Sequence, residues 1–419
     1  MGARGQNIGK ANKDSISKPT WYPKEGHNFI QFQWKEKLNA KDGEIDFQAF
    51  LNPQYLETKK EKVIPFKKSD SFNRTQSLDY GLFFSYRREI GKIRITSGAD
   101  VFGRTGVQAK SMTTTYNESG EILSSFEEWP YRKGMRSDLG FFLSLDYFGL
   151  KNIDLVGGGR LDIIRLKALS GGSVQFAKSE HTAVTGFIGS SFKITPNIVL
   201  FANIARAYRV PSLSELFYSG ITGRGSIIAQ PGLKPETSLN LEGGLRFFTQ
   251  DFYLGAYIFV YEIDHLIERF MLQPKVYTYG NINKGRISGY ELEIEYFPRP
   301  GWKIYGNYFA FFGKSLDFKD DLNDIPPARL FLGSELWIGR LSLGINTTVQ
   351  QKKNRPGPAE IHIPGYFVIN IKANYMIGSS FRIFTLLSNC LQRSYIARPD
   401  PDAVYEPGRN LQLGLNYQF

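Results

Sequence analysis

The chain has 419 residues and a formal net charge of +12, with 15% aromatic and 22% charged residues. Its single cysteine, Cys390, excludes an internal disulfide and a cysteine-based metal cluster, and no apolar run of about 18 residues is present to form a transmembrane helix. The basic residues are spread along the chain without a nucleic-acid-binding motif, so the charge predicts no nucleic-acid partner.

Residues 1–27 form a polar segment that lacks the apolar stretch of a secretory signal. From there to the C-terminus, short segments alternate between apolar and polar residues. Because successive side chains of a β-strand point to opposite faces, each segment predicts a strand with one apolar and one polar wall. The predicted strands are 27–36, 44–51, 76–87, 92–102, 138–148, 152–166, 181–193, 198–208, 238–248, 252–262, 286–297, 302–312, 328–338, 341–350, 365–377, 381–389 and 409–419.

Short turns and long polar segments alternate between these strands. The predicted long loops are 103–137, 209–237, 263–285, 313–327, 351–364 and 390–408. A meander with tight turns at one end and long loops at the other is typical of outer-membrane β-barrels. We therefore predict an all-β, antiparallel, up-and-down transmembrane barrel over residues 28–419.

Two strands show the contrast between the walls most clearly. Leu411, Leu413, Leu415, Tyr417 and Phe419 share one face of the last strand, as expected for a wall in contact with lipid. In the strand 286–297, Glu291, Glu293 and Glu295 share the face opposite Tyr290, Leu292 and Ile294. Three carboxylates on one face need water or cations, so we predict that they face an aqueous lumen.

The predicted number of strands is about 17, which is odd. A closed antiparallel barrel needs an even number, because an open edge leaves backbone groups unsatisfied in lipid. Either one strand is miscounted or the chain is part of a larger barrel.

Five segments carry recognisable motifs: residues 204–216, 231–237, 281–293, 325–329 and 405–419. The first contains Arg206, Tyr208, Arg209 and Pro211, and it resembles the Phe-Arg-Ala-Pro box of TonB-dependent outer-membrane receptors, with Tyr208 in place of Phe and Val210 in place of Ala. The other four segments resemble further motifs of the same family. The resemblance covers the second half of the chain well and the first half only in general pattern. It implies a 22-stranded barrel preceded by a signal peptide, a TonB box and a plug domain, none of which is recognised in this sequence.

The resemblance also implies a function. Receptors of this family take up an iron-siderophore, haem, cobalamin or another large nutrient in the outer membrane of Gram-negative bacteria, and the sequence does not choose among these. Two alternatives remain open, a passive pore and a truncated receptor that transports nothing. We predict no enzyme and no cofactor, because no catalytic arrangement of side chains can be placed.

The candidate functional residues fall into three groups. Arg206, Tyr208, Arg209 and Pro211 lie where a strand enters a long loop, so they are candidates for ligand binding or for barrel architecture. Tyr417 and Phe419 are the candidate signal for the outer-membrane assembly machinery. Asp317, Asp320, Asp321 and Asp324 form either a weak calcium site or a solvated acidic loop. The expected partners are outer-membrane lipid and lipopolysaccharide, the assembly machinery, and the TonB complex if a plug with a TonB box is supplied upstream.

Overall fold

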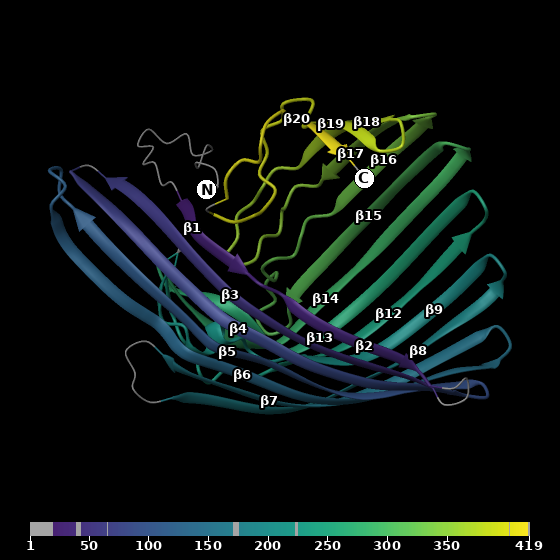
Figure 1. Cartoon of the computed structure of the whole chain (residues 1–419), viewed down its shortest axis with the longest axis horizontal. Helices are drawn as coiled ribbons and strands as arrows, with labels where there is room; N and C mark the ends of the chain where they lie inside the picture. Colours follow the sequence, from purple (N-terminus) through teal and green to yellow (C-terminus); the bar gives the residue numbers. More distant parts are fainter. Residues whose placement is uncertain are drawn as a thin grey trace.

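A computed structural model describes residues 20–38, 43–64, 66–170, 176–222, 225–401 and 403–417. Nearly all of them belong to one meander of β-strands that curves into a broad trough (Figure 1). None of the helices in these ranges has the length and apolar character needed to cross a membrane.

The elements, in chain order, are β1 (Thr20–His27), β2 (Ile30–Lys37), β3 (Glu44–Ile64), β4 (Lys67–Ile90), β5 (Ile93–Tyr116), β6 (Ile122–Leu150), β7 (Ile153–Ser170), β8 (Ala177–Thr195), β9 (Ile198–Arg209), α1 (Leu213–Phe217), β10 (Gly220–Thr222), β11 (Gly225–Ile228), β12 (Glu236–Phe248), β13 (Phe252–Gln273), β14 (Val276–Arg299), β15 (Trp302–Ser315), β16 (Arg329–Ile338), β17 (Leu341–Gln350), β18 (Tyr366–Ile377), β19 (Phe381–Ser388) and β20 (Asn410–Tyr417).

The wall is built from neighbours in sequence that pair antiparallel. Successive strands pair from β3 to β9 and from β12 to β20, and β9 pairs with β12. Both β1 and β2 pair with β3, and the short β10–β11 hairpin lies apart from this order. With β1 and β2 counted as one position, the wall has the predicted number of strands, and the predicted antiparallel meander is confirmed.

The two outermost strands each have one neighbour. β20 pairs with β19, and no ladder among the described ranges joins β20 to β1 or β2. In addition, β1 begins at Thr20, so the sheet starts ahead of the predicted boundary after residue 27. Residues 1–19 lie outside the described residues.

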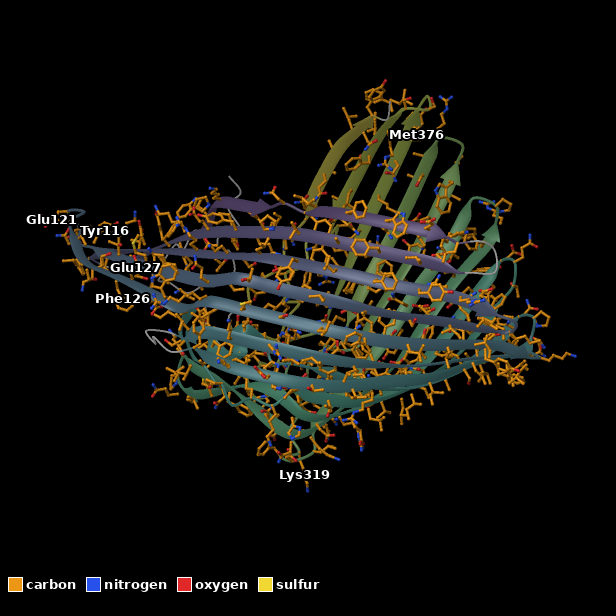
Figure 2. The ribbon with its side chains drawn as sticks, turned by 60° about the horizontal axis from the view of Figure 1, so that its bottom comes forward. Tyr116, Glu121, Phe126, Glu127, Lys319 and Met376 are labelled. Atoms are coloured by element: carbon orange, nitrogen blue, oxygen red, sulfur yellow. The ribbon has the colours of Figure 1, made fainter. Side chains whose placement is uncertain are left out.

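Two of the predicted long loops are wrong. Most of 103–137 belongs to β5 and β6, and most of 263–285 belongs to β13 and β14. These hairpins are about twice as long as one crossing of roughly 9–11 residues requires. Beyond the membrane both faces of a strand meet water, so the alternation that reveals a strand in the sequence disappears there. Figure 2 shows Tyr116 and Glu121 at the tip of β5–β6, far from Met376 near the turn after β18.

The two faces of the wall differ as predicted. On β20, Leu411, Leu413 and Leu415 are 60%, 72% and 69% exposed. The opposite face of the wall carries polar contacts between strands, such as the ion pair of Lys303 Nζ with Glu295 Oε1 at 2.7 Å. An exposed apolar face of this extent is stable only in contact with another apolar phase, here lipid.

The tight turns share one end of the wall, which we call the tight-turn end. Gly339 between β16 and β17 and Gly378 after β18 have φ values of 56° and 65°. This left-handed conformation strains other residues, and it suits both the two-residue turn at Gly339 and the three-residue turn that begins at Gly378.

A small apolar core lies at the other end, the long-loop end. Leu216 and Phe217 of α1 are fully buried and share a cluster with Ile164 and Leu166 of β7. A capping box starts α1, because Ser212 Oγ accepts from Glu215 N–H while the Glu215 carboxylate accepts from Ser212 N–H.

The segment between β9 and β12 spans a stretch of the wall as a cross-connection (residues 210–235). At one side, Ser219 N–H donates to Pro130 O of β6 at 3.1 Å. At the other, β11 pairs in parallel with Val276–Thr278 of β14. The cross-connection therefore joins two strands, β6 and β14, that are several positions apart in the meander.

Candidate binding site at the long-loop end

An arginine clamp fixes the point where β9 enters the cross-connection. Arg209 Nε and Nη2 donate to the two carboxylate oxygens of Glu236 on β12 at 2.6 and 2.7 Å, and Nη1 donates to Glu215 of α1 at 3.0 Å. Glu236 Oε1 also accepts from the buried Ile267 N–H of β13 at 2.7 Å. Because its donors are already engaged by carboxylates, Arg209 holds β9, α1, β12 and β13 together.

The other three predicted rim residues lie in different surroundings. Pro211 is fully buried, and Tyr208 packs against the apolar core beside α1. Arg206 is exposed and pairs with Leu239 of β12, so the two share a face opposite to that of Arg209. The structure does not bring these four residues together into one pocket, and their role in ligand binding stays a prediction.

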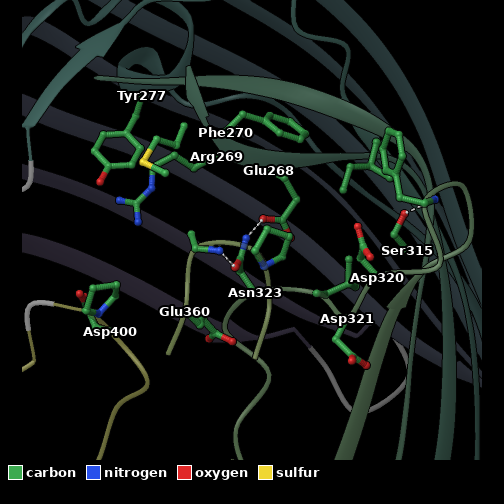
Figure 3. A pocket seen from close by; sticks show the side chains of 17 residues that line it. Glu268, Arg269, Phe270, Tyr277, Ser315, Asp320, Asp321, Asn323, Glu360 and Asp400 are labelled. Atoms are coloured by element: carbon green, nitrogen blue, oxygen red, sulfur yellow. Dashed lines mark hydrogen bonds between the residues drawn. The ribbon is translucent and has the colours of Figure 1, made fainter. Parts of the chain in front are cut away.

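A cavity of about 500 Å³ lies at the long-loop end, between β13 and three loops (Figure 3). Phe270, Met271, Tyr277 and Phe318 supply apolar surface. Its charged lining residues are Glu268, Arg269, Asp320, Asp321, Glu360 and Asp400. A second cavity of about 510 Å³ shares Glu268, Asn323 and Glu360 with the first, so the two cavities are adjacent.

Asn323, from the loop between β15 and β16, joins this loop to its neighbours. Its side-chain Nδ2 donates to Glu268 Oε2 of β13 at 2.9 Å, and its Oδ1 accepts from Ala359 N–H at 2.9 Å. Gly357 lies so close that a Cβ there would be 2.6 Å from the Asn323 backbone nitrogen. Figure 3 shows Asn323 between Glu268 and the loop that carries Glu360.

A buried ion pair fixes the loop between β17 and β18. Lys353 Nζ lies 2.8 Å from Glu360 Oε2, with side chains only 5% and 7% exposed. The Glu360 carboxylate also accepts from Gly357 N–H and Asp324 N–H, each at 2.8 Å, and Lys353 Nζ donates to Ile325 O. Such a pair is tolerated in a low-dielectric site only when hydrogen bonds satisfy both ions.

Glu268 is a cavity carboxylate whose pKa is shifted by its surroundings. It lies near the end of the 22-residue β13, beyond the part needed for one crossing. Burial raises the pKa of Glu268, and Asn323 offsets part of this by its hydrogen bond. The site therefore combines apolar walls with carboxylates that accept hydrogen bonds, an arrangement that can bind an amphipathic ligand.

The remaining predicted residues have defined places. On β14, Glu295 contacts Lys303 and Glu293 accepts from Tyr257 Oη at 3.3 Å, on the face opposite Leu292. Tyr417 ends β20 with its ring 5.1 Å from that of Phe381, and Phe419 lies outside the described residues.

The four aspartates of the predicted calcium loop do not converge. Asp317 accepts from Lys284 N–H at 3.1 Å, whereas Asp320 and Asp321 line the cavity. In the described ranges, no group of three or more His, Cys, Asp or Glu side chains is placed to hold a metal ion.

Sequence reasoning missed Glu268, Asn323, Lys353 and Glu360. They lie outside the alternating segments, and the spacing of loop residues does not reveal which will meet. Glu236 lies in the segment 231–237, which resembles a family motif. This resemblance is the sequence feature that could have pointed to Glu236 as a partner of Arg209.

The fold and the site define the class of protein, which is an outer-membrane β-barrel receptor. The features that define it are the antiparallel meander, the apolar outer face and the loop-covered site at one end. The chain matches the family described as "TonB dependent receptor-like, beta-barrel" over residues 8–389, and it belongs to that family. Proteins of this family are located in the outer membrane of Gram-negative bacteria.

Relatives and solved structures agree with this assignment. The chain is 26% identical over 261 residues to the heme/hemopexin utilization protein C of Haemophilus influenzae, covering 55% of this chain and 36% of that protein. It is 22% identical over 365 residues to the hemin receptor of Yersinia pestis, covering 79% of this chain and 52% of that protein. The copper transporter OprC has a similar fold, with a TM-score of 0.80 and 17% identity over 96% of this chain and 69% of that chain. The chain thus spans about half or less of the length of these two curated relatives, one of which is named as a utilization protein and the other as a receptor.

Proposed function

We propose that the chain forms the barrel of a receptor that takes up a large nutrient, such as an iron-siderophore, across the outer membrane. The observation that carries the proposal is the site beneath three loops at the long-loop end of a membrane-spanning wall. Its combined apolar and carboxylate lining suits a ligand of several hundred daltons. Membership of the receptor family and the named relatives support the same function.

In this proposal the wall is part of a larger, 22-stranded barrel. The face that carries Glu291, Glu293 and Glu295 lines its lumen, and Tyr417 with Phe419 contacts the assembly machinery. Coupling to the TonB complex requires a plug with a TonB box from elsewhere in the gene product. We propose no enzymatic step, because the described side chains form a binding site without a nucleophile beside a base.

Uptake by a receptor-deficient Gram-negative strain tests the proposal. The gene product, expressed from its natural start, is assayed for uptake of labelled iron-siderophore, haem and cobalamin, with and without a functional tonB gene. We expect uptake of one of these ligands that is lost without tonB. Uptake that continues without tonB supports the passive pore instead, and no uptake of any ligand supports a non-functional fragment.

Binding to the cavity is tested with a matched pair of variants. Glu268→Ala and Phe270→Ala remove one polar and one apolar part of the lining, and we expect each to weaken ligand binding about tenfold or more. Glu180→Ala, on β8 away from the cavity, is the control and should bind normally. Equal affinity of all three proteins would contradict the assignment of the cavity.

A further inference from the structure

The charges that line the first cavity are opposite in sign to the charge of the chain as a whole. The chain has a formal net charge of +12, yet several carboxylates line this cavity against a single guanidinium, that of Arg269. The carboxylates belong to Glu268, Asp320, Asp321, Glu360 and Asp400. A diffuse excess of basic residues would give the cavity a positive lining, so the negative lining is a local property of the site.

Three of these carboxylates have no cation of the protein beside them. Glu360 is neutralised by the buried Lys353, whose Nζ lies 2.8 Å away. By contrast, no lysine or arginine nitrogen of the described residues lies within 4.0 Å of the carboxylates of Glu268, Asp320 or Asp321. Figure 3 shows Glu268 entering the site from β13, and Asp320 and Asp321 from the loop before β16. A positively charged ligand in the cavity would meet these three carboxylates first.

Aromatic rings line the same cavity. Phe270 and Phe318 are 37% and 63% exposed. The ring of Tyr277 already has a cation over it, since the guanidinium of Arg269 lies 5.0 Å from the ring centre. The face of an aromatic ring is negative and attracts cations, more strongly where water is excluded. The rings and the carboxylates therefore favour the same sign of charge in a ligand.

The surroundings of Glu268 oppose its own negative charge. Burial raises the pKa of Glu268, and the neighbouring carboxylates of Asp324, Glu236 and Glu360 raise it further. A cation bound beside Glu268 would counteract these effects, because an opposite charge stabilises the ionised form of a carboxyl group.

The carboxylates are spread around the cavity and do not gather at one point. In the described ranges, no three His, Cys, Asp or Glu side chains come close enough together to hold a metal ion. A calcium ion needs several oxygen ligands within about 2.6 Å, whereas an organic cation can contact separate carboxylates and rings along its length. The cavity volume of about 500 Å³ is that of a small-molecule site.

We propose that the ligand of this cavity is an amphipathic organic cation, in which positively charged nitrogen groups are attached to an apolar or aromatic body. This inference rests on the proposed function and names the substrate class of the same site. The carboxylates that have no protein cation bind the charged groups, and Phe270, Phe318 and Tyr277 contact the body. Nutrients whose surface carries carboxylates or other anions are bound less tightly, because the same lining repels them.

Two dyes with the same xanthene ring system and opposite charge test this inference. Tetramethylrhodamine methyl ester is a cation, and fluorescein is an anion at neutral pH. The full chain, folded in a neutral detergent, is titrated with each dye, and binding is followed by fluorescence polarisation against detergent micelles alone. We expect the rhodamine ester to bind at least tenfold more tightly, with a preference that falls as salt concentration rises. Nonspecific binding to the cationic chain would favour fluorescein instead.

Variants that remove charge locate the binding. Asp320→Asn with Asp321→Asn removes two loop carboxylates with little change in shape, and we expect binding of the rhodamine ester to weaken about tenfold or more. Asp317→Asn is the matched control, because this aspartate lies in the same loop but outside the cavity lining, and it should change the affinity less than twofold. Phe318→Leu should weaken binding several-fold through loss of the ring. Glu268→Gln, on β13, covers the case in which the loop variant fails to fold.

Equal affinity for the two dyes, tighter binding of fluorescein, or unchanged binding by the folded variants would overturn the inference. Displacement of the rhodamine ester by micromolar calcium would show a metal site and would also overturn it. These outcomes leave the proposed function intact, because that function is tested with the nutrients themselves. Uptake that does not depend on tonB would instead contradict the proposed function while leaving the dye preference unchanged, so the two failures are distinguishable.

Discussion

The two halves of the wall differ in structure beyond the membrane, where one half continues as paired strands and the other as loops. Strands β3 to β6 are 21 to 29 residues long and continue as paired hairpins far past the spanning part. Strands β16 to β19 are 8 to 12 residues long and give way to loops without regular pairing. The sheet is continuous through both halves, so the difference arises entirely at the long-loop end.

The contrast shows two ways of satisfying the same backbone groups. In the long hairpins the ladder satisfies N–H and C=O groups residue by residue, with side chains adding little. In the loops, individual side chains do this work: Glu360 accepts from two backbone N–H groups, and Asn389 binds backbone groups of Arg393 and Pro407. We therefore expect the folded structure of the loops that follow β16 to β19 to depend on a few side chains. The folded structure of the long hairpins of β3 to β6 should not depend on any single side chain.

The largest effect is expected from Lys353→Met. This change leaves the buried Glu360 carboxylate without its cation, at a cost of about 3–5 kcal/mol. We expect faster hydrogen exchange in residues 316–327 and 351–364, measured by mass spectrometry, and weaker nutrient binding. Lys353→Met with Glu360→Leu should recover part of the protection. Unchanged exchange in both loops would contradict the role given to this pair.

Arg209→Met should have the next largest effect. Glu236, whose side chain is 12% exposed, loses its bidentate partner, and the loss of such charge-assisted hydrogen bonds costs roughly 1.5–3 kcal/mol. Increased proteolysis of residues 210–235 would report release of α1. Arg206→Met serves as the control, since that side chain faces the other way, and cleavage at equal rates in both variants would rule out the clamp.

Lys110→Met is the counterpart of Lys353→Met in the hairpin half. Lys110 Nζ lies 2.9 Å from Glu127 Oε2 across the β5–β6 hairpin. Because the ladder remains intact, we expect hydrogen exchange of residues 105–130 to change less than twofold. A large increase in the exchange rate of these residues would show that the long hairpins also depend on single side chains, and it would contradict the contrast drawn between the two halves of the wall.

The smallest effect concerns pH. Burial raises the pKa of Glu268, so the folded site binds a proton more readily than the unfolded chain does. The stabilising contribution of this protonation is complete below the ordinary pKa of 4.5 and disappears as pH rises through the raised value. We expect the protection factors of the loops around the cavity, which are corrected for the intrinsic pH dependence of amide exchange, to be somewhat higher at pH 4.5 than at pH 7. Glu268→Gln should remove this difference, and its persistence in that variant would assign it to another group.

The sequence predicts the membrane-spanning part of this protein well, for a physical reason. Between lipid and water, a strand must alternate, so Leu411, Leu413 and Leu415 reveal both the strand and its orientation. Beyond the membrane this requirement disappears, and the hairpin tips at Tyr116 and Lys275 could not be predicted. The cavity was harder still, because the meeting of Glu268 with Asn323 depends on how a loop folds back. Arg206 shows the limit of motif reasoning, since its neighbour Arg209 belongs to the same motif and points to the other face.

The cross-connection between β6 and β14 has a mechanical consequence. It links β6 directly to β14, which are the two ends of a curved part of the sheet that runs from β6 through β9 and β12 to β14. The distance between these two strands, and with it the curvature of the sheet between them, is fixed as long as both attachments hold. The width of the barrel beneath this segment is therefore set locally, by the bonds of Ser219 to Pro130 and of β11 to Val276–Thr278, and strands elsewhere in the wall can shift without changing it.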